Sequence, residues 1–238
     1  MRIALIGYGK MGKAVEQIAL ERGHTITAVI DINTTDKISE NLKSIADIAI
    51  EFTSPNSAKQ NVINCLQNGI SVVSGTTGWD LNKDEFKKLC IKNSAAVFYA
   101  SNFSIGVNVF MKINEKLAEL LSGFNDYEAK IEETHHIHKL DKPSGTAITL
   151  ANGIIKNNPK YVKWMLNPCN EKNKIEINSF REGEIYGDHK IIWENDIDII
   201  SISHSAKSRR GLAQGAIMAA EFVIGKIGVF SMSDLLKL

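Results

Sequence analysis

Cysteine is scarce in this sequence, and its three positions, Cys65, Cys90 and Cys169, lie far apart. Because the sequence has no Cys-x-x-Cys pair, it predicts neither a thiolate zinc site nor a disulfide framework. The first apolar run, residues 3–6, is too short for the core of a signal peptide. Reduced thiols without a leader are typical of a cytoplasmic protein, and we expect that location.

Long apolar runs and charge of one sign are also missing. No run approaches the roughly 20 apolar residues that cross a bilayer. The net charge is only +1 over 238 residues, so no strong overall field attracts nucleic acid or anionic membranes. A hydrophobic fraction of 44% nevertheless supports a substantial core. We therefore expect a small-molecule partner, with no nucleic acid and no membrane.

A glycine turn follows the first predicted strand. Residues 2–6 are β-prone and lead into Gly7-Tyr8-Gly9-Lys10-Met11-Gly12, after which apolar residues recur at helical spacing. Gly7 suits a tight turn, Gly9 lets the backbone approach a pyrophosphate, and Gly12 allows close packing of the helix. These six residues therefore predict a dinucleotide site, although a purely structural glycine turn is the alternative reading.

An acidic residue ends the second predicted strand, residues 25–30. Asp31 lies near the expected spacing of about 20 residues beyond the glycine turn, where a carboxylate binds the adenine ribose hydroxyls. The 2′-phosphate of NADPH would meet this negative charge, and the next residues, Ile32 and Asn33, supply no cation. The sequence thus favours NADH, with NADPH as a possible second cofactor.

Further strands are predicted over residues 46–52, 70–73 and 95–99, with helices between them. Loops at the carboxyl ends of parallel strands line the ligand crevice of such a sheet. The cofactor-side candidates are Gly75, Thr76 and Thr77 after one strand, and Ala100, Ser101, Asn102 and Phe103 after the next. Ordinary polar loops would give the same pattern.

The alternation of strands and helices stops near residue 124. Residues 127–132 alternate in polarity and predict a half-buried strand that leads to His135. A helix is expected over 145–156, loop or partial helix over 157–173, and strands over 175–180, 183–193 and 196–203. Strands clustered in this way predict a mostly antiparallel sheet with helices on one face. A final helix is expected over 209–224.

These patterns predict an α/β protein with two domains. Residues 1–103 with 209–238 form a Rossmann-type, doubly wound parallel sheet that binds the dinucleotide. Residues 104–208 form a second, α+β domain that carries the substrate site.

Titratable side chains are concentrated in residues 135–147, where three of the six histidines fall within four positions. His135 and His136 point to opposite sides if the strand continues, so their roles should differ. Histidine titrates near pH ~6.5, which suits proton transfer. Lys139 offers an ammonium for a carboxylate, or an acid if its surroundings favour the neutral amine.

A helix start follows at once. Ser144, Gly145 and Thr146 offer amides and hydroxyls that suit a second carboxylate. The segment therefore predicts a pocket for a small dianionic acid. Two alternatives remain: a metal site, although His-His-x-His matches no ligand spacing that we know and no metal is predicted, and histidines with only structural roles.

The whole chain resembles the 4-hydroxy-tetrahydrodipicolinate reductase (dihydrodipicolinate reductase) family of bacterial lysine and diaminopimelate synthesis. The most specific match is Glu133-x-His135-His136-x-x-Lys139-x-Asp141-x-Pro143-Ser144-Gly145-Thr146-Ala147. Gly75-Thr76-Thr77-Gly78, Asn102-Phe103-Ser104-x-Gly106-Val107-Asn108 and Arg181-x-Gly183-x-Ile185-x-Gly187-x-His189 also match in order.

The resemblance implies hydride transfer from NAD(P)H to the ring of a cyclic dicarboxylate, with loss of its hydroxyl as water. It implies that His135 is the proton donor and acceptor and Lys139 a proton donor. His136, Gly145 and Thr146 would bind substrate, and the glycine turn, Asp31, residues 75–77 and residues 100–103 would contact the cofactor. A homotetramer built through the sheets of the second domain is also implied.

Three positions depart from the common family pattern. The glycine turn is one residue shorter than Gly-x-x-Gly-x-Met-Gly, Glu51 stands for the usual aspartate, and Ile32 stands where many members carry a basic residue. Two other functions also fit the glycine turn: an amino-acid dehydrogenase of the aspartate or homoserine type, and a dinucleotide sensor without turnover. Neither needs the histidine–lysine cluster.

Overall fold

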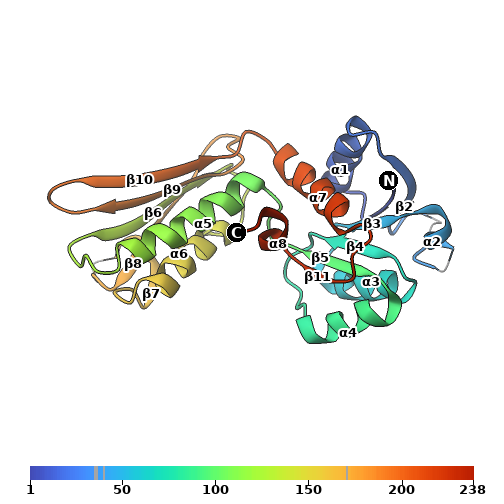
Figure 1. Ribbon diagram of the computed structural model, residues 1–238. Helices are drawn as coiled ribbons and strands as arrows, with labels where there is room; N and C mark the ends of the chain where they lie inside the picture. The colour runs from blue at the N-terminus through green and yellow to red at the C-terminus, as the bar shows by residue number, and fades with distance from the viewer. Residues whose placement is uncertain (35–36, 40, 170) are drawn as a thin grey trace. The chain divides into compact units, whose positions relative to one another are not determined.

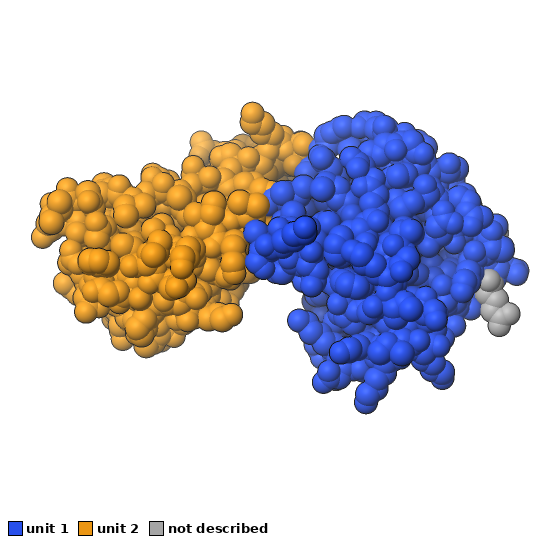
Figure 2. Space-filling model, in the orientation of Figure 1, with its two compact units in different colours: residues 1–105, 209–238 blue, residues 106–208 orange. Residues whose placement is uncertain are grey.

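The chain divides into two compact units. A computed structural model describes residues 1–34, 37–39, 41–169 and 171–238. One unit comprises residues 1–105 and 209–238, and the other residues 106–208 (Figure 2). The first boundary lies two residues beyond the expected position. Within the described ranges, no helix has the length and apolarity to cross a membrane.

The first unit is built on a six-stranded parallel sheet. Its strands are β1 (Arg2–Ile6), β2 (Thr25–Ile30), β3 (Ile48–Glu51), β4 (Ser71–Ser74), β5 (Ala96–Tyr99) and β11 (Gly228–Phe230). Their order is β11-β5-β4-β3-β1-β2, and every pairing is parallel. The chain therefore winds first to one side of β1 and then to the other. The expected doubly wound sheet is confirmed, and its switch point lies between β1 and β3.

Helices cover both faces of this sheet (Figure 1). Helices α1 (Lys10–Glu21) and α7 (Arg210–Val223) pack on one face, and α3 (Pro55–Gln67) and α4 (Lys83–Asn93) on the other. The central strands are consequently apolar along nearly their whole length, as strands buried on both faces must be. Two short helices, α2 (Leu42–Ile45) and α8 (Met232–Leu236), complete the unit.

The second unit holds a five-stranded sheet with helices on one face. Its strands are β6 (Glu128–His135), β7 (Lys163–Leu166), β8 (Lys174–Arg181), β9 (Asp188–Glu194) and β10 (Ile199–Ser205), in the order β10-β9-β6-β8-β7. Helices α5 (Ile105–Leu120) and α6 (Gly145–Asn157) pack against it (Figure 1). Ile131, Ile177 and Ile191 are fully buried beneath them.

The second sheet is mixed, whereas the sequence predicted a mostly antiparallel one. Strand β9 pairs antiparallel with β6 and β10, but β8 pairs parallel with both β6 and β7. Helix α6 carries the chain back along the sheet after β6, and such a crossover permits parallel pairing. Strand β7 falls in the span expected to be loop or partial helix, because a half-exposed edge strand shows no clear alternation.

Candidate active site

The glycine turn after β1 closes tightly on its neighbours. Gly7 has φ +89°, and a Cβ there would lie 2.0 Å from the carbonyl oxygen of Phe52 at the end of β3. A Cβ on Gly12 would lie 2.3 Å from the oxygen of Gly7, whereas one on Gly9 would meet open space. Gly7 and Gly12 are thus required for packing, and Gly9 leaves the backbone open to a ligand.

Asp31 lies directly against this turn. Its Oδ2 accepts a hydrogen bond of 2.5 Å from the amide of Tyr8, and its Oδ1 one of 2.7 Å from the amide of Ile32. The first turn of α1 has no side-chain cap, and the exposed Lys10 begins it. Met11 packs partly against the core. The uncapped helix start and the acid therefore share one edge of the sheet, as a dinucleotide site requires.

The loops after β4 and β5 contain side chains with different tasks. Thr76 is buried, and its hydroxyl donates to Glu51 at 2.7 Å. Phe103 is 2% exposed, with its ring 6.0 Å from that of Phe52. The side chains of Thr76 and Phe103 hold the two loops in place. At these two residues only the main chain is open to a cofactor. Thr77 and Ser101 are exposed.

Glu51 is a buried carboxylate at the end of β3 that the sequence did not single out as functional. It is 0% exposed and accepts hydrogen bonds from the hydroxyls of Ser74 and Thr76. The amide and hydroxyl of Thr53 also donate to it. One carboxylate therefore joins the loops that follow β3 and β4, beside the switch point.

In the second unit, β6 ends in an acid and a histidine on the same side. Glu133 and His135 alternate with half-buried neighbours and are themselves 1% and 7% exposed. Glu133 Oε2 lies 2.5 Å from His135 Nδ1. Burial opposes ionisation of Glu133, but interactions with His135 and Arg181 lower its pKa to about 2. The carboxylate is therefore charged at cell pH.

The second oxygen of Glu133 binds two other donors. Oε1 accepts from Arg181 Nη1 at 3.1 Å and from the amide of Ser144 at 3.3 Å. The same guanidinium donates to the carbonyl oxygens of Lys139 and Asp141, at 3.2 and 2.5 Å. Glu133 thus connects the histidine, the lysine loop and the start of α6.

His189 faces the same cluster from β9. Its ring lies 5.1 Å from that of His135, and its Nε2 is 3.2 Å from the hydroxyl of Ser144. Burial and the charge of His135 lower the pKa of His189 to about 4. His189 is therefore neutral at cell pH. The hydroxyl of Ser144 also accepts a hydrogen bond from the amide of Ala147 and so caps α6.

The remaining predicted residues lie around this buried cluster. Strand β6 ends at His135, and the amide of His136 donates to the oxygen of Ile185 at 2.7 Å. Lys139 Nζ lies 2.8 Å from Asp141. Gly145 is exposed with open space at its Cβ position, and Thr146 follows it in the first turn of α6. His138 is exposed and lies 3.5 Å from Glu184.

The structure brings together a different set of possible metal ligands from the one suggested by the sequence. Among the described residues, the group able to hold an ion is Glu133, His135 and His189, not the His-His-x-His run. Ligands at about 2.0–2.2 Å from a tetrahedral ion are roughly 3.4 Å apart, whereas Glu133 and His135 are 2.5 Å apart. That separation is too short for two ligands of one ion.

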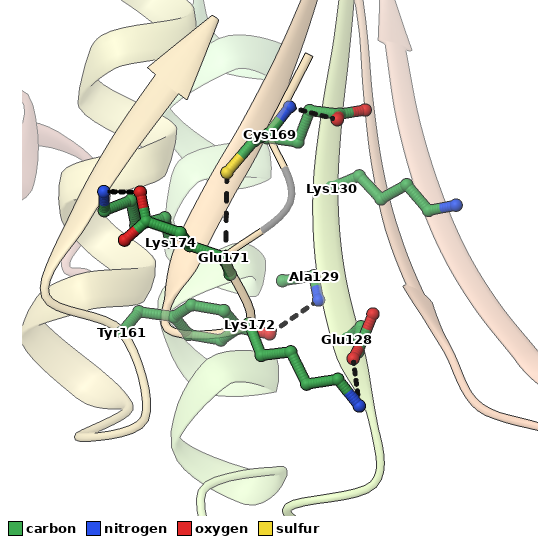
Figure 3. A pocket seen from close by; sticks show the side chains of 9 residues that line it. Glu128, Ala129, Lys130, Tyr161, Cys169, Glu171, Lys172 and Lys174 are labelled. Carbon is green, nitrogen blue, oxygen red and sulfur yellow. Dashed lines mark hydrogen bonds and ion pairs between the residues drawn. The ribbon is translucent and has the colours of Figure 1, made fainter. Parts of the chain in front are cut away.

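A separate hollow of about 300 Å³ lies at the other end of β6 (Figure 3). Its lining includes Glu128, Lys172, Glu171 and Lys174. These side chains pair as Lys172 with Glu128 and Lys174 with Glu171. Because the charges of these pairs compensate one another, the hollow does not have the excess cationic character that a dianionic acid needs.

The doubly wound sheet and the buried acid–histidine cluster define a dinucleotide-binding reductase of two units. Comparison with known proteins narrows this class. Residues 1–103 match the family model for the dihydrodipicolinate reductase N-terminus, and residues 106–236 that for its C-terminus. The chain belongs to the dihydrodipicolinate reductase family.

Curated relatives support this assignment over the full chain. A 4-hydroxy-tetrahydrodipicolinate reductase from Christiangramia forsetii is 44% identical over 100% of this chain and 98% of its own. One from Thermosipho africanus is 34% identical with the same coverage. The fold matches a dipicolinate-bound dihydrodipicolinate reductase from Paenisporosarcina, with a TM-score of 0.77, 23% identity and 97% coverage of each chain.

The sequence alone predicts no role for Glu133, Arg181, Gly187 or His189, although each stands in a matching motif. One signal was available for Glu133: residues two apart on a strand share a face. The partners from β8 and β9 depend on the register between strands, which pairs His135 with Arg181 and Glu133 with His189.

Proposed function

We propose that this protein reduces 4-hydroxy-tetrahydrodipicolinate to tetrahydrodipicolinate in lysine and diaminopimelate synthesis. The ring receives a hydride, and its hydroxyl leaves as water. The observation that carries the proposal is the Glu133–His135 pair beside the Lys139 loop and the start of α6. Full-length relatives with this activity in their names support it.

The dinucleotide binds the first unit at the edge where β1 and β2 end. The glycine turn, Gly7 to Gly12, approaches its phosphates, because Gly9 leaves open space and α1 has no side-chain cap. Residues 75–77 and 100–103 contact it mainly through their main chain. When bound, the cofactor supplies the hydride.

Asp31 sets the cofactor preference. Its carboxylate lies on the glycine turn, 2.5 Å from the amide of Tyr8, where it binds ribose hydroxyls and repels a 2′-phosphate. Ile32 beside it is 94% exposed and adds no positive charge. NADH is therefore the preferred cofactor, and NADPH a weaker one.

His135 and Lys139 move protons in the second unit. Glu133 contacts His135 at Nδ1, so the opposite ring nitrogen, Nε2, is the atom that gives or takes a proton. The ammonium of Lys139 forms an ion pair with Asp141, and a substrate carboxylate can replace Asp141 as its partner. Lys139 then donates a proton or neutralises the acid.

The start of α6 and His136 bind the two carboxylates of the substrate. Gly145 and Thr146 offer main-chain amides in the first turn, where helix geometry favours an anion. Ser144 is 2% exposed and its hydroxyl already contacts Ala147 and His189, so it supports this turn mainly from beneath.

The test is a coupled assay. Purified protein should oxidise NADH only when the product of dihydrodipicolinate synthase is supplied, and NADPH should serve less well. Absence of turnover with either cofactor would contradict the proposal and leave the sensor alternative. Turnover with an amino acid and oxidised cofactor would instead indicate the dehydrogenase alternative.

Assembly and location are part of the proposal. We expect a homotetramer formed through the second sheet, whose exposed side carries Phe180 and Ile199, 50% and 65% exposed. The reduced thiols predicted from the sequence are consistent with a cytoplasmic location.

A further inference from the structure

We infer that Glu133 is the positioning residue of the site, which fixes the tautomer of His135 and holds the Lys139 loop and the start of α6 in place. Only the kinetic test of this inference rests on the proposed function; the tautomer of His135 can be tested without turnover. It concerns a residue that does not itself touch substrate.

The first step is the proton on His135. Glu133 Oε2 and His135 Nδ1 lie 2.5 Å apart, and two atoms with only lone pairs would repel each other at this distance. A proton on Nδ1 removes that repulsion, so the contact favours the tautomer with Nδ1 protonated. The other oxygen of this carboxylate accepts from Arg181 and from the amide of Ser144, so the carboxylate is the charged partner and the proton lies on the histidine. Neutral His135 therefore carries its proton on Nδ1 and a free lone pair on Nε2.

The second step concerns the side of the ring that bears Nε2. A Cβ at Gly187 would lie 2.9 Å from that nitrogen, and Gly187 also has φ +153°. Glycine at this position therefore prevents a side chain from covering Nε2. The carboxylate on one side and the glycine on the other leave Nε2 as the working nitrogen.

The third step is the orientation of Glu133 itself. Its Oε1 accepts from two donors, Arg181 Nη1 and the amide of Ser144, so an acceptor atom is required there. A glutamine at position 133 must place its oxygen at this point and its NH₂ against His135 Nδ1. An NH₂ group donates, so Nδ1 must lose its proton, and neutral His135 must become the Nε2–H tautomer.

Other charged groups around His135 do not substitute for Glu133. His189 faces the ring from β9 and is neutral, and Arg181 from β8 is positive. Lys139 and His204 also lie close enough to act on His189 by charge. Glu133 is the negative group in this set, and its removal leaves Arg181 without its buried counter-ion.

The decisive variant is Glu133→Gln, with Glu132→Gln as its matched control. Glu132 precedes Glu133 on β6 and its side chain lies on the opposite face of the sheet. Glu132→Gln therefore removes the same charge outside the cluster. Ring ¹⁵N spectra, recorded at a pH where ordinary histidines are neutral, report the tautomer; His135→Gln assigns the signal. Wild type and the control should show a protonated Nδ1, and Glu133→Gln a protonated Nε2.

Kinetics give the second readout. For Glu133→Gln we expect kcat to fall about 100-fold, because Nε2 can no longer accept a proton, with KM within about three-fold of wild type. Glu133→Asp keeps the acceptor and should recover part of the loss. The control should keep wild-type kcat.

The outcomes separate this inference from the proposed function. If the wild-type protein shows no turnover, the proposed function is contradicted. The ¹⁵N spectra still determine the tautomer of His135 in that case. A Glu133→Gln protein with a protonated Nδ1 overturns the inference, whether kcat falls or not. Equal losses in Glu132→Gln would also overturn it, because a general effect of charge would then explain the result.

Discussion

Two residues flank the ring of His135 in the second unit. The carboxylate of Glu133 contacts one ring nitrogen, and the backbone of Gly187 leaves space beside the other. In the proposed mechanism, this arrangement lets His135 give and take a proton at Nε2 alone. Three predictions belong at the scale of single residues.

The first concerns the proton transfer itself. His135→Gln should lower kcat by about 10²–10⁴-fold, the usual contribution of a general acid or base. NADH affinity, measured by fluorescence titration, should stay near wild type, because His135 belongs to the second unit and the glycine turn to the first. Loss of NADH binding would assign His135 to the cofactor rather than to the substrate.

The second concerns cofactor choice. Asp31→Ala should shrink the preference for NADH, because NADPH then meets no negative charge beside the glycine turn. The measurement is the ratio of kcat/KM for the two cofactors. A suitable control is Asp47→Ala, which removes an acid at the opposite end of the sheet that pairs with Arg2. An unchanged ratio for Asp31→Ala would remove this residue from the ribose site.

The third concerns His189 and acid. Its pKa is about 4 in the folded protein against an ordinary 6.5, so the unfolded chain binds more protons between these values. Its contribution to stability is full above pH 6.5 and is lost as pH falls toward 4, on the order of 3 kcal/mol. Urea unfolding across this range should show a smaller loss in His189→Asn than in wild type.

The exposed His138 provides the control for that experiment. His138→Asn removes a histidine whose side chain is 71% exposed, and it supplies the baseline against which the pH dependence of unfolding of His189→Asn is compared. If His189→Asn matched wild type, His189 would not be held neutral by burial.

At the scale of elements, the carboxyl ends of β3 and β4 depend on Glu51. This buried carboxylate accepts from Ser74, Thr76 and Thr53. Glu51→Ala would leave buried hydroxyls without a partner, each at about 1–3 kcal/mol. We expect urea unfolding to show a loss of about 3 kcal/mol and NADH to bind more weakly. Glu51→Asp, the residue usual in the family, should retain more of both.

The elements also show how far the sequence could be interpreted. Strand β1, the glycine turn and Asp31 were predictable because each depends on local pattern: apolar runs, positive φ and spacing. Strand β7 was not, since a short edge strand has no clear alternation. The parallel pairing of β6 with β8 was not predictable either, because register depends on contacts distant in sequence.

In the candidate site, too, residues close in sequence were predictable and residues brought together by strand pairing were not. His135, Lys139 and the start of α6 are contiguous in sequence, and their titratable chemistry marked them. Arg181 and His189 join them only through pairing of β8 and β9 with β6. No pattern in one sequence supplies that register, so their contacts with Glu133 and Ser144 required the fold.

At the scale of the whole molecule, we expect an assembly that forms through the second sheet. The side of the second sheet that faces away from α5 and α6 carries the exposed Phe180 and Ile199. Light scattering should give four times the chain mass. Ile199→Asp should shift the protein toward smaller species, whereas Ile32→Asp, in the first unit, should not. A monomeric wild type would remove the tetramer from the proposal.

The central claim is that a hydride reaches the ring of the dicarboxylate while its hydroxyl leaves. The most direct measurement supplies the product of dihydrodipicolinate synthase together with NADH deuterated at the transferable position, and determines the product by mass spectrometry. We predict tetrahydrodipicolinate that carries one deuterium and lacks the hydroxyl oxygen. Cofactor oxidation without deuterium in that product would contradict the account.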